Sequence, residues 1–228
     1  MSKICTYLNA LFAIIAFIAA FLNIPYMNNY IVIIVSILAI VALNYIKVSI
    51  IDAEVKQNKK IEEFKGIGVY LVSYKQMGNH NVALIRRRKK ENFILIEEGI
   101  LEELSDKEKE AVYYHELGHL DTISAEFIFI IQGISFLFNT TGLYSIFHGR
   151  QNYLLVTVGA ILFVFSEWLR RYVEYDADKK AILLGASKED LISAICKIDE
   201  MNSKNNKIIM SGHPKTKKRI NKIKYLTI

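Results

Sequence analysis

The sequence predicts a mainly α-helical integral-membrane protein with four membrane-spanning helices. The chain has 228 residues, 52% of them hydrophobic, and its mean hydropathy of +0.23 is high for a soluble domain. Its charged fraction of 23% is nevertheless ordinary. Both properties coexist because apolar and charged residues are segregated. Residues 4–22 and 30–46 are almost free of charge, whereas 52–121 and 170–228 hold most of the charges.

Residues 1–51 are expected to form the first two transmembrane helices. A helix rises about 1.5 Å per residue, so about 20 apolar residues cross the hydrocarbon core of a bilayer. The runs 4–22 and 30–51 meet this length, and the uncharged turn between them contains the helix breaker Pro25. A cleaved signal peptide is disfavoured, because no convincing A-x-A site follows the first run and a second span follows at once.

Two further transmembrane helices are expected within 123–169. Residues 123–147 are mostly apolar, and residues 153–169 are apolar until Glu167. Both runs contain polar side chains, which inside a span usually face protein or water. The alternative is that the two segments are buried helices of a soluble domain. The polar residues of the first run include Glu126, Gln132 and Asn139.

The basic residues predict the orientation of these spans. Lys47 lies near the end of the second span, and Lys56, Lys59 and Lys60 follow it. Arg170 and Arg171 follow the fourth span, whereas the turn at 23–29 has no charge. By the positive-inside rule, both termini and the 52–122 segment lie in the cytoplasm, as in a multi-pass protein of the cell (plasma) membrane. Segments separated by an even number of spans lie on the same membrane face, so the two charged segments can share one site.

A five-residue motif predicts a zinc site. A capping box at 105–108 opens a helix that continues into the sequence HELGH at 115–119. Residues four apart share one face of a helix, so His115 and His119 can bind the same zinc ion. Glu116 follows the first histidine and is the candidate general base for attack of water on a peptide carbonyl.

A second motif, the sequence EYDAD at 174–178, supplies the candidate third ligand. Glu174 would complete a set of three protein ligands and leave the fourth position of one zinc ion per chain to water. Asp178 lies four residues later on the same helix face and could accept the free ring N–H of a ligand histidine. The alternative for both carboxylates is a solvated helix face, since Asp and Glu are usually exposed. The HELGH motif and the shared membrane face favour the metal site.

These motifs resemble the HtpX and CAAX prenyl protease family of membrane zinc metalloproteases, most closely its HtpX branch. The pattern of that family is HExxH between membrane spans, an E-x-x-x-D helix, and a downstream His-Pro with a following Arg; the last two elements are His213-Pro214 and Arg219 here. The resemblance covers most of 75–228. It implies a cytoplasmic, gluzincin-like zinc protease domain with a small β-sheet or hairpin, one strand of which receives the substrate as an added strand.

The resemblance also implies roles for two residues near the C-terminus. By position alone, His213 is a surface histidine in a basic tail, whereas the resemblance places it in the catalytic cleft, where it helps to stabilise the oxyanion. Arg219 is expected to organise the acidic residues nearby. The family's Asn-x-x-Ala strand motif has only an approximate counterpart at 81–84, which is not predicted as a substrate site. The resemblance does not extend to 54–80.

A basic run at 86–90 and the net charge of +6 raise the possibility of a nucleic-acid partner. No aromatic residues interleave with this run, and no RNA-binding signature surrounds it. It is better explained as a hairpin turn between strands at 82–86 and 92–97, close to anionic lipid. The expected partners are therefore a protein or peptide substrate and the lipid bilayer, with no nucleic acid. No role is expected for His80 or His148, and no disulfide is expected from two distant cysteines.

The predicted function is hydrolysis of peptide bonds in membrane or misfolded proteins at the cytoplasmic face, the quality-control role that the HtpX resemblance implies. Two alternatives remain open: a processing protease for a specific peptide or lipidated substrate, and a non-proteolytic zinc-binding membrane protein. Glu116 argues against the second, because a structural zinc site needs no general base. The oligomeric state is not predicted. The expected segments are 1–51, 52–122, 123–169 and 170–228.

Overall fold

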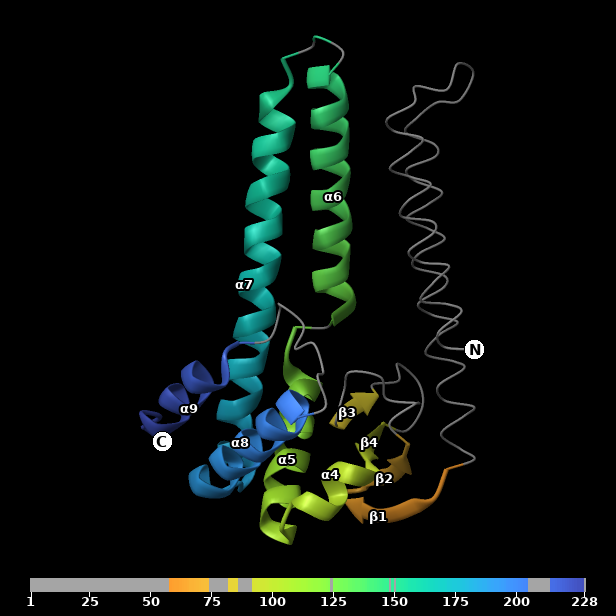
Figure 1. Cartoon of the computed structure of the whole chain (residues 1–228), viewed down its shortest axis with the longest axis vertical. Coiled ribbons are helices and arrows are strands. Elements are labelled where there is room, and N and C mark those ends of the chain that lie inside the picture. Colours follow the sequence, from red (N-terminus) through yellow and green to blue (C-terminus); the bar gives the residue numbers. More distant parts are fainter. Residues whose placement is uncertain are drawn as a thin grey trace. The chain divides into compact units, whose positions relative to one another are not determined.

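The computed structural model of the chain describes residues 58–73, 82–85, 92–123, 125–147, 149, 151–204 and 214–227 (Figure 1). The first two expected spans, the basic run at 86–90 and His213 lie outside these residues. The chain divides into two compact units. In its described part, the first unit comprises Ala125–Glu167. The second unit comprises the described residues of Asn58–Ser124 and Trp168–Ile228.

The second unit contains a four-stranded sheet with the order β1-β2-β4-β3. The central pair β2 and β4 is parallel, and the outer pairs β1–β2 and β3–β4 are antiparallel. The small sheet is thus present. The strands predicted at 82–86 and 92–97 pair antiparallel within one residue of their predicted bounds, and the turn predicted between them lies outside the described residues. The bounds are β1 Lys60–Phe64, β2 Ile67–Val72, β3 Val82–Ile85 and β4 Phe93–Glu97.

The hairpin β1–β2 was not predicted. Its two turn residues, Lys65 and Gly66, both have positive φ angles, of 50° and 79°. A two-residue turn with this backbone matches the right-handed twist of the strands on either side, which is why the chain reverses here. Strand β1 has the sequence KIEEF and is largely exposed, so it lacks the apolar alternation by which a strand is recognised.

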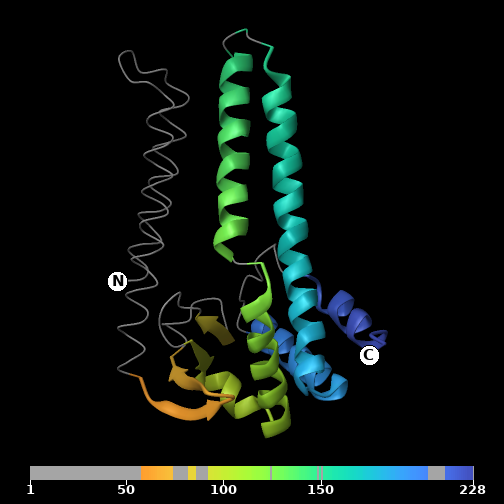
Figure 2. The same cartoon turned by 180° about the vertical axis from the view of Figure 1, so that it is seen from behind.

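Four α-helices and one 3-10 helix lie wholly within the second unit, where they pack around the sheet or follow it (Figures 1 and 2). The central one is α5, whose residues 111–116 are all buried. Val112 and Tyr113 on one face of α5 pack with Ile94 and Ile96 of β4. The opposite face packs Tyr114 into a second apolar cluster. The helices are α4 Glu98–Glu103, α5 Asp106–Gly118, η1 His119–Asp121, α8 Lys188–Lys204 and α9 Thr216–Lys224.

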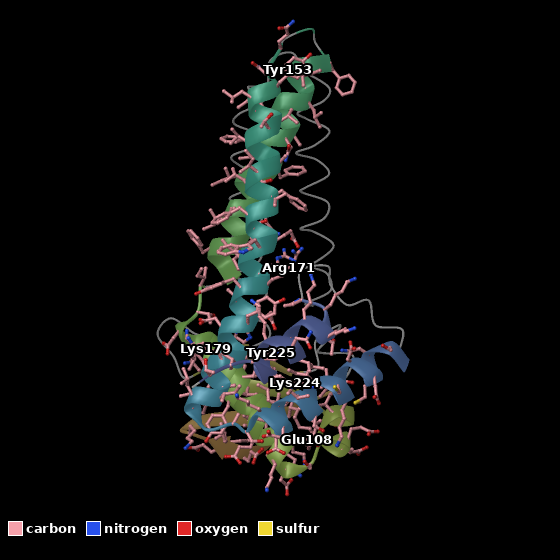
Figure 3. All side chains as sticks on the ribbon, turned by 90° about the vertical axis from the view of Figure 1, so that its left-hand side faces the viewer. Glu108, Tyr153, Arg171, Lys179, Lys224 and Tyr225 are labelled. Carbon is pink, nitrogen blue, oxygen red and sulfur yellow. The ribbon has the colours of Figure 1, made fainter. Side chains whose placement is uncertain are left out.

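Two long helices follow the sheet and α5 in the chain, α6 Ala125–Phe147 and α7 Tyr153–Leu184. Both are long and apolar enough to cross a membrane. In the most apolar 18-residue stretch of each helix, only 28% of the residues of α6 and 17% of those of α7 are buried. The core helix of a soluble domain would be mostly buried, so the low burial favours spans over that alternative. Figure 3 shows side chains projecting outward along α7 between Tyr153 and Arg171.

Three polar side chains of α6 face α7, as expected for polar groups inside a span. Ser135 Oγ donates to the carbonyl oxygen of Gly159 at 2.7 Å, and Gln132 Nε2 donates to Glu167 Oε1 at 3.3 Å. Asn139 lies so close to Gly159 that a Cβ on the glycine would come within 2.7 Å of its side chain. Polar contacts and close approach therefore hold α6 against the first part of α7.

Helix α7 continues without a break from the fourth expected span into the EYDAD segment. A boundary at 169/170 therefore falls inside a helix. The helix continues because no Gly or Pro occurs between Gly159 and Gly185. The change from apolar to charged side chains alters what surrounds the helix, but it does not interrupt the backbone. The helix ends before Gly185, whose φ of 129° is accessible to glycine.

Glu108 connects the start of α5 to α8. Its carboxylate accepts from the backbone N–H of Ser105 at 2.7 Å, completing the predicted capping box. It also accepts from Ser193 Oγ at 2.5 Å and from Lys197 Nζ at 2.7 Å. Burial raises the pKa of Glu108, but the hydrogen bonds from Lys197, Ser193 and Ser105 outweigh it and lower the pKa to about 2.

Glu108→Gln is expected to destabilise the second unit by about 1–3 kcal/mol at neutral pH, because three donors lose a charged acceptor. A carboxylate whose pKa is depressed on folding stabilises fully above its unfolded value and loses that stabilisation as the pH falls toward the folded value. The free energy of unfolding of the wild type should thus decrease as the pH is lowered from about 4.5 to about 2. In the variant this decrease should be less steep. Thermal unfolding in detergent checks this, with the exposed Glu110→Gln as control. Equal stability of both variants at neutral pH would contradict it.

Candidate metal centre

Helix α5 and the short 3-10 helix η1 that directly continues it place both histidines of the HELGH motif on one face, one helical turn apart. The Nε2 atoms of His115 and His119 lie 3.2 Å from each other, and the two rings meet edge to face with centroids 4.8 Å apart. His115 is buried and His119 is half-buried. The α5 helix ends at Gly118, and His119 begins the short 3-10 helix η1. The two ring nitrogens are therefore directed toward one point at the C-terminal end of α5.

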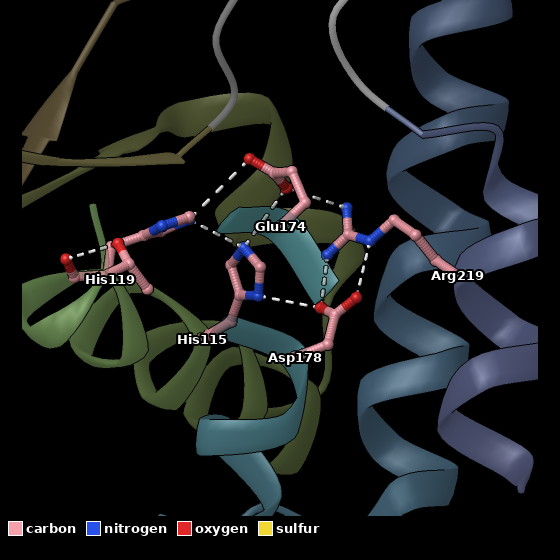
Figure 4. Close-up of polar contacts among 6 residues, drawn as sticks. His115, His119, Glu174, Asp178 and Arg219 are labelled. Carbon is pink, nitrogen blue, oxygen red and sulfur yellow. Dashed lines mark hydrogen bonds and ion pairs between the residues drawn. The ribbon is translucent and has the colours of Figure 1, made fainter. Parts of the chain in front are cut away.

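Helix α7 brings a carboxylate to the same point. Glu174 Oε2 lies 3.7 Å from His115 Nε2, and Glu174 Oε1 lies 3.9 Å from His119 Nε2. One donor atom from each of the three residues can be chosen so that all lie within 4.8 Å of one another. Figure 4 shows the three side chains converging. The two motifs are 55 residues apart in the chain, and the fold joins them into one cluster.

Asp178 and Arg219 contact two members of this cluster, His115 and Glu174 (Figure 4). Asp178 Oδ1 lies 2.9 Å from His115 Nδ1, the ring nitrogen that faces away from the cluster. Arg219 of α9 donates from Nε to Asp178 Oδ2 at 2.9 Å and from Nη2 to Asp178 Oδ1 at 2.6 Å. Its Nη1 lies 3.6 Å from Glu174 Oε2. One guanidinium thus orients two of the three carboxylates of the EYDAD segment, Asp178 through a bidentate pair and Glu174 through a second contact.

The electrostatics of the cluster follow from burial and these contacts. Burial lowers the pKa of His115, but the hydrogen bond and the charge of Asp178 outweigh it and raise the pKa. Burial and the neighbouring His115 lower the pKa of His119 to about 4. Burial lowers the pKa of Arg219, yet Asp178, Glu174 and Glu116 raise it further above its ordinary value. Asp178 therefore favours a proton on Nδ1 of His115 and leaves Nε2 to face the cluster.

The donor set fits a zinc ion. Two imidazole nitrogens and one carboxylate oxygen form the three-ligand set typical of catalytic zinc, with one further position open. An acceptor for the other ring N–H of a ligand histidine is the usual supporting contact, and Asp178 provides it for His115. With neutral imidazoles, the carboxylates of Glu116, Glu174 and Asp178 face one guanidinium. This arrangement would leave two negative charges, which one divalent cation would balance.

Gly118 of the HELGH motif permits the close approach of α5 and α7. A Cβ at this position would lie 2.7 Å from the carbonyl oxygen of Ala177 and 3.0 Å from its Cα. Lys180 of α7 also links the two helices. Its Nζ donates to the carbonyl oxygen of Asp121, which follows α5, at 2.8 Å, and it pairs with Asp176 at 2.9 Å. Glu174 and Asp178 flank Ala177, so this backbone contact sets their distance from the histidines.

Gly118→Ala is expected to lower metal affinity by about 10–100-fold, although alanine is the better helix former. The added methyl group meets backbone atoms that cannot move independently, so α7 must shift and carry Glu174 away from the imidazoles. Titration of the metal-free protein with zinc measures the effect. Gly99→Ala is the matched control, because the nearest atom to its Cβ is Met201 Cε at 3.6 Å. Equal zinc affinity of the two variants would show that the approach at Gly118 does not position the site.

Most of the residues singled out from the sequence meet in this cluster. His115, His119, Glu174, Asp178 and Arg219 are joined by the contacts above. Glu116 is buried on α5 beside the first histidine, and its charge acts on Arg219. His213 is outside the part of the chain that the structure describes, while the following Pro214 is buried. Sequence reasoning missed Gly118 and Lys180, although glycine between the two histidines was a signal of close packing.

The comparisons with known proteins agree with this arrangement. The model of peptidase family M48 matches residues 71–227. The crystal structure of S. mikatae Ste24p is similar to the chain, with a TM-score of 0.53 and 16% sequence identity. That similarity covers 92% of this chain and 61% of the Ste24p chain, so this chain spans less than two thirds of that structure. At this identity the likeness concerns the fold alone. No curated protein sequence matches the chain.

Proposed function

The chain belongs to peptidase family M48, and on this premise we propose that it is a zinc metalloendopeptidase embedded in the cell membrane. The observation that carries the proposal is the convergence of His115, His119 and Glu174 within 4.8 Å, with Glu116 buried beside them. The family implies a metal cofactor, and the donor set favours zinc, since nitrogen ligands are less suited to magnesium or calcium.

The proposed mechanism assigns a role to each side chain. A zinc ion held by His115, His119 and Glu174 supplies Lewis acidity, which makes water nucleophilic near neutral pH. The Glu116 carboxylate accepts a proton from the attacking water and returns it to the leaving amine. Asp178 keeps the proton of His115 on Nδ1, and Arg219 fixes Asp178 and Glu174. His213 is proposed, on the family resemblance, to donate a hydrogen bond to the oxyanion.

The substrate is proposed to bind as an extended strand along β3. This strand is the last in the sheet order, and it packs near α5, the helix that carries His115 and ends directly before His119. An edge strand offers unpaired backbone groups, to which a peptide of almost any sequence can hydrogen-bond. Binding of this kind suits a protease that acts on many unfolded segments, such as the HtpX-like quality control of membrane or misfolded proteins.

The active site is proposed to lie at the cytoplasmic membrane surface. Glu174 follows Leu169, the last apolar residue of the expected span, by five residues, which is about 7.5 Å along a continuous helix. The basic residues Arg170 and Arg171 between them support the cytoplasmic side. The first two spans, which together with α6 and α7 would make four, belong to this proposal. A substrate segment that leaves the bilayer would thus meet the site almost at once.

Removal of the metal tests the proposed activity. The full chain in nanodiscs is expected to cleave an unfolded model protein such as casein, to lose at least about 100-fold in rate after dialysis against a zinc chelator, and to recover with one equivalent of zinc per chain. Cleavage that survives complete removal of metal would contradict the proposal. Product analysis by mass spectrometry distinguishes internal cleavage from trimming of the ends.

A processing protease for one peptide or lipidated protein shares the same chemistry and differs only in its substrates. Comparing the membrane proteomes of cells that carry the wild-type chain or Glu116→Gln separates the two. Quality control predicts many accumulated proteins in the variant, whereas a processing role predicts one or a few uncleaved precursors. A non-proteolytic zinc protein predicts no difference, and the buried Glu116 beside the donor set argues against it.

A further inference from the structure

Helix α9 has two chemically distinct faces. Residues 214–227 contain six basic side chains and no acidic one. Ile223 is fully buried, and Thr216, Arg219 and Ile220 on the same side are half-buried. The remaining side chains of the helix are exposed, and all but Asn221 are lysines. These lysines, Lys217, Lys218, Lys222 and Lys224, form the basic face of α9.

The basic face lies close to the part of the second unit that is suited to a membrane surface. Lys222 Nζ lies over the Tyr175 ring of α7, 3.6 Å from its centroid. One turn earlier in α7, the rings of Trp168 and Tyr172 stack with centroids 5.6 Å apart, next to the exposed Arg171. Trp, Tyr and Arg at the end of an apolar helix mark the headgroup region of a bilayer. Tyr175 is about 4.5 Å along the helix from Tyr172, well within a Debye length of about 8 Å.

The covered face of α9 reaches the metal centre. Arg219 is bidentate to Asp178, which in turn contacts His115 at 2.9 Å, and Arg219 also lies 3.6 Å from Glu174. A helix of nine residues is marginal by itself, so its order depends on what its two faces bind. Any partner that holds the basic face also holds the guanidinium that orients two side chains of the site.

From these contacts we infer that the basic face of α9 docks on anionic lipid headgroups at the membrane surface, and that this docking holds Arg219 against Asp178 and Glu174. The inference rests on the proposed membrane location and not on proteolytic activity. Each lysine near an anionic surface strengthens attraction by about fivefold, so three or four together suffice to order a short helix. The exposed ring of Tyr225 directly after the helix, 84% accessible, suits the same interface (Figure 3).

Other polyanions can in principle bind lysines, but the surroundings favour lipid. Neighbouring aromatic rings in a nucleic-acid site stack on bases. Here Trp168 and Tyr172 stack on each other, and the Tyr175 ring is covered by Lys222. An acidic protein segment would require the same face but would not depend on the lipid composition. Lipid dependence therefore separates these partners.

Amide hydrogen exchange of the full chain in nanodiscs tests the inference. Replacing pure phosphatidylcholine by a mixture with 30% phosphatidylglycerol is expected to slow exchange of residues 217–224 by about tenfold or more. High salt should remove the effect. The variant Lys217→Gln/Lys218→Gln/Lys224→Gln should lose it, whereas the matched variant Lys217→Arg/Lys218→Arg/Lys224→Arg should keep it. Exchange in α5 and α8 reports on folding and should be the same in all three proteins.

Several results would overturn the inference. The first is equal exchange of α9 in both lipid mixtures, and the second is equal slowing in the Gln variant. The third is that poly-glutamate or single-stranded DNA slows exchange of α9 in neutral nanodiscs, whereas phosphatidylglycerol does not. The readout needs no substrate and no bound metal. A chain without peptidase activity can therefore still show lipid docking, and a chain without lipid docking can still be a peptidase.

Discussion

Glu116→Gln is expected to lower kcat for peptide hydrolysis by about 10²–10⁴-fold while leaving the metal content unchanged. Glutamine has nearly the size and shape of glutamate, and it keeps the buried position beside His115. Its amide cannot accept a proton from water, so the general base is lost. The metal donors are on His115, His119 and Glu174, so zinc should bind as in the wild type.

The comparison needs both kcat/KM on a fluorogenic peptide and zinc per chain by elemental mass spectrometry, measured on the same preparations. Glu110→Gln is the matched control, because Glu110 is an exposed glutamate on the same helix. It should retain both activity and zinc. If Glu116→Gln kept more than about a tenth of the wild-type kcat, another residue would have to serve as the base.

Glu174→Ala is expected to weaken zinc binding by at least about 100-fold and to abolish activity as a result, since the loss of a direct ligand exceeds the 10–100-fold effect of a supporting residue. The same substitution leaves Nη1 of Arg219 without its contact to Glu174 at 3.6 Å. Asp178→Asn should have the smaller effect, because it alters the partner of His115 Nδ1 but removes no donor atom.

Zinc titrations of the metal-free proteins measure this order. Glu200→Ala, at an exposed glutamate of α8, is the control and should bind zinc as the wild type does. Wild-type zinc affinity in Glu174→Ala would remove Glu174 from the ligand set. An equal loss in Glu174→Ala and Asp178→Asn would indicate that both act by positioning.

The parts of the site that sequence could predict are those that depend on helix periodicity. His115 and His119, and Glu174 and Asp178, are each four apart, and a spacing of four keeps side chains on one face wherever the helix lies. The capping box at 105–108 is likewise local, and it is formed as predicted. The family resemblance joined these local patterns into one site, and the match of peptidase family M48 confirms that resemblance.

The parts that escaped prediction depend on contacts between distant segments or on weak local signals. The need for Gly118 arises from the backbone of Ala177, 59 residues later, and no local pattern encodes that approach. The charged strand β1 resembles a loop in composition, because an edge strand needs no apolar face on both sides. The length of α7 is likewise not visible in composition, because the helix runs unbroken through the change from apolar to charged residues.

The central claim is that His115, His119 and Glu174 hold one zinc ion. X-ray absorption at the zinc edge, on the full chain loaded with one equivalent of zinc, tests it most directly. The expected spectrum has two imidazole ligands at about 2.0–2.1 Å, oxygen in the remaining positions and no sulfur. In Glu174→Ala the oxygen contribution should fall or the zinc should be lost. A sulfur shell, or a single imidazole, would contradict the proposed site.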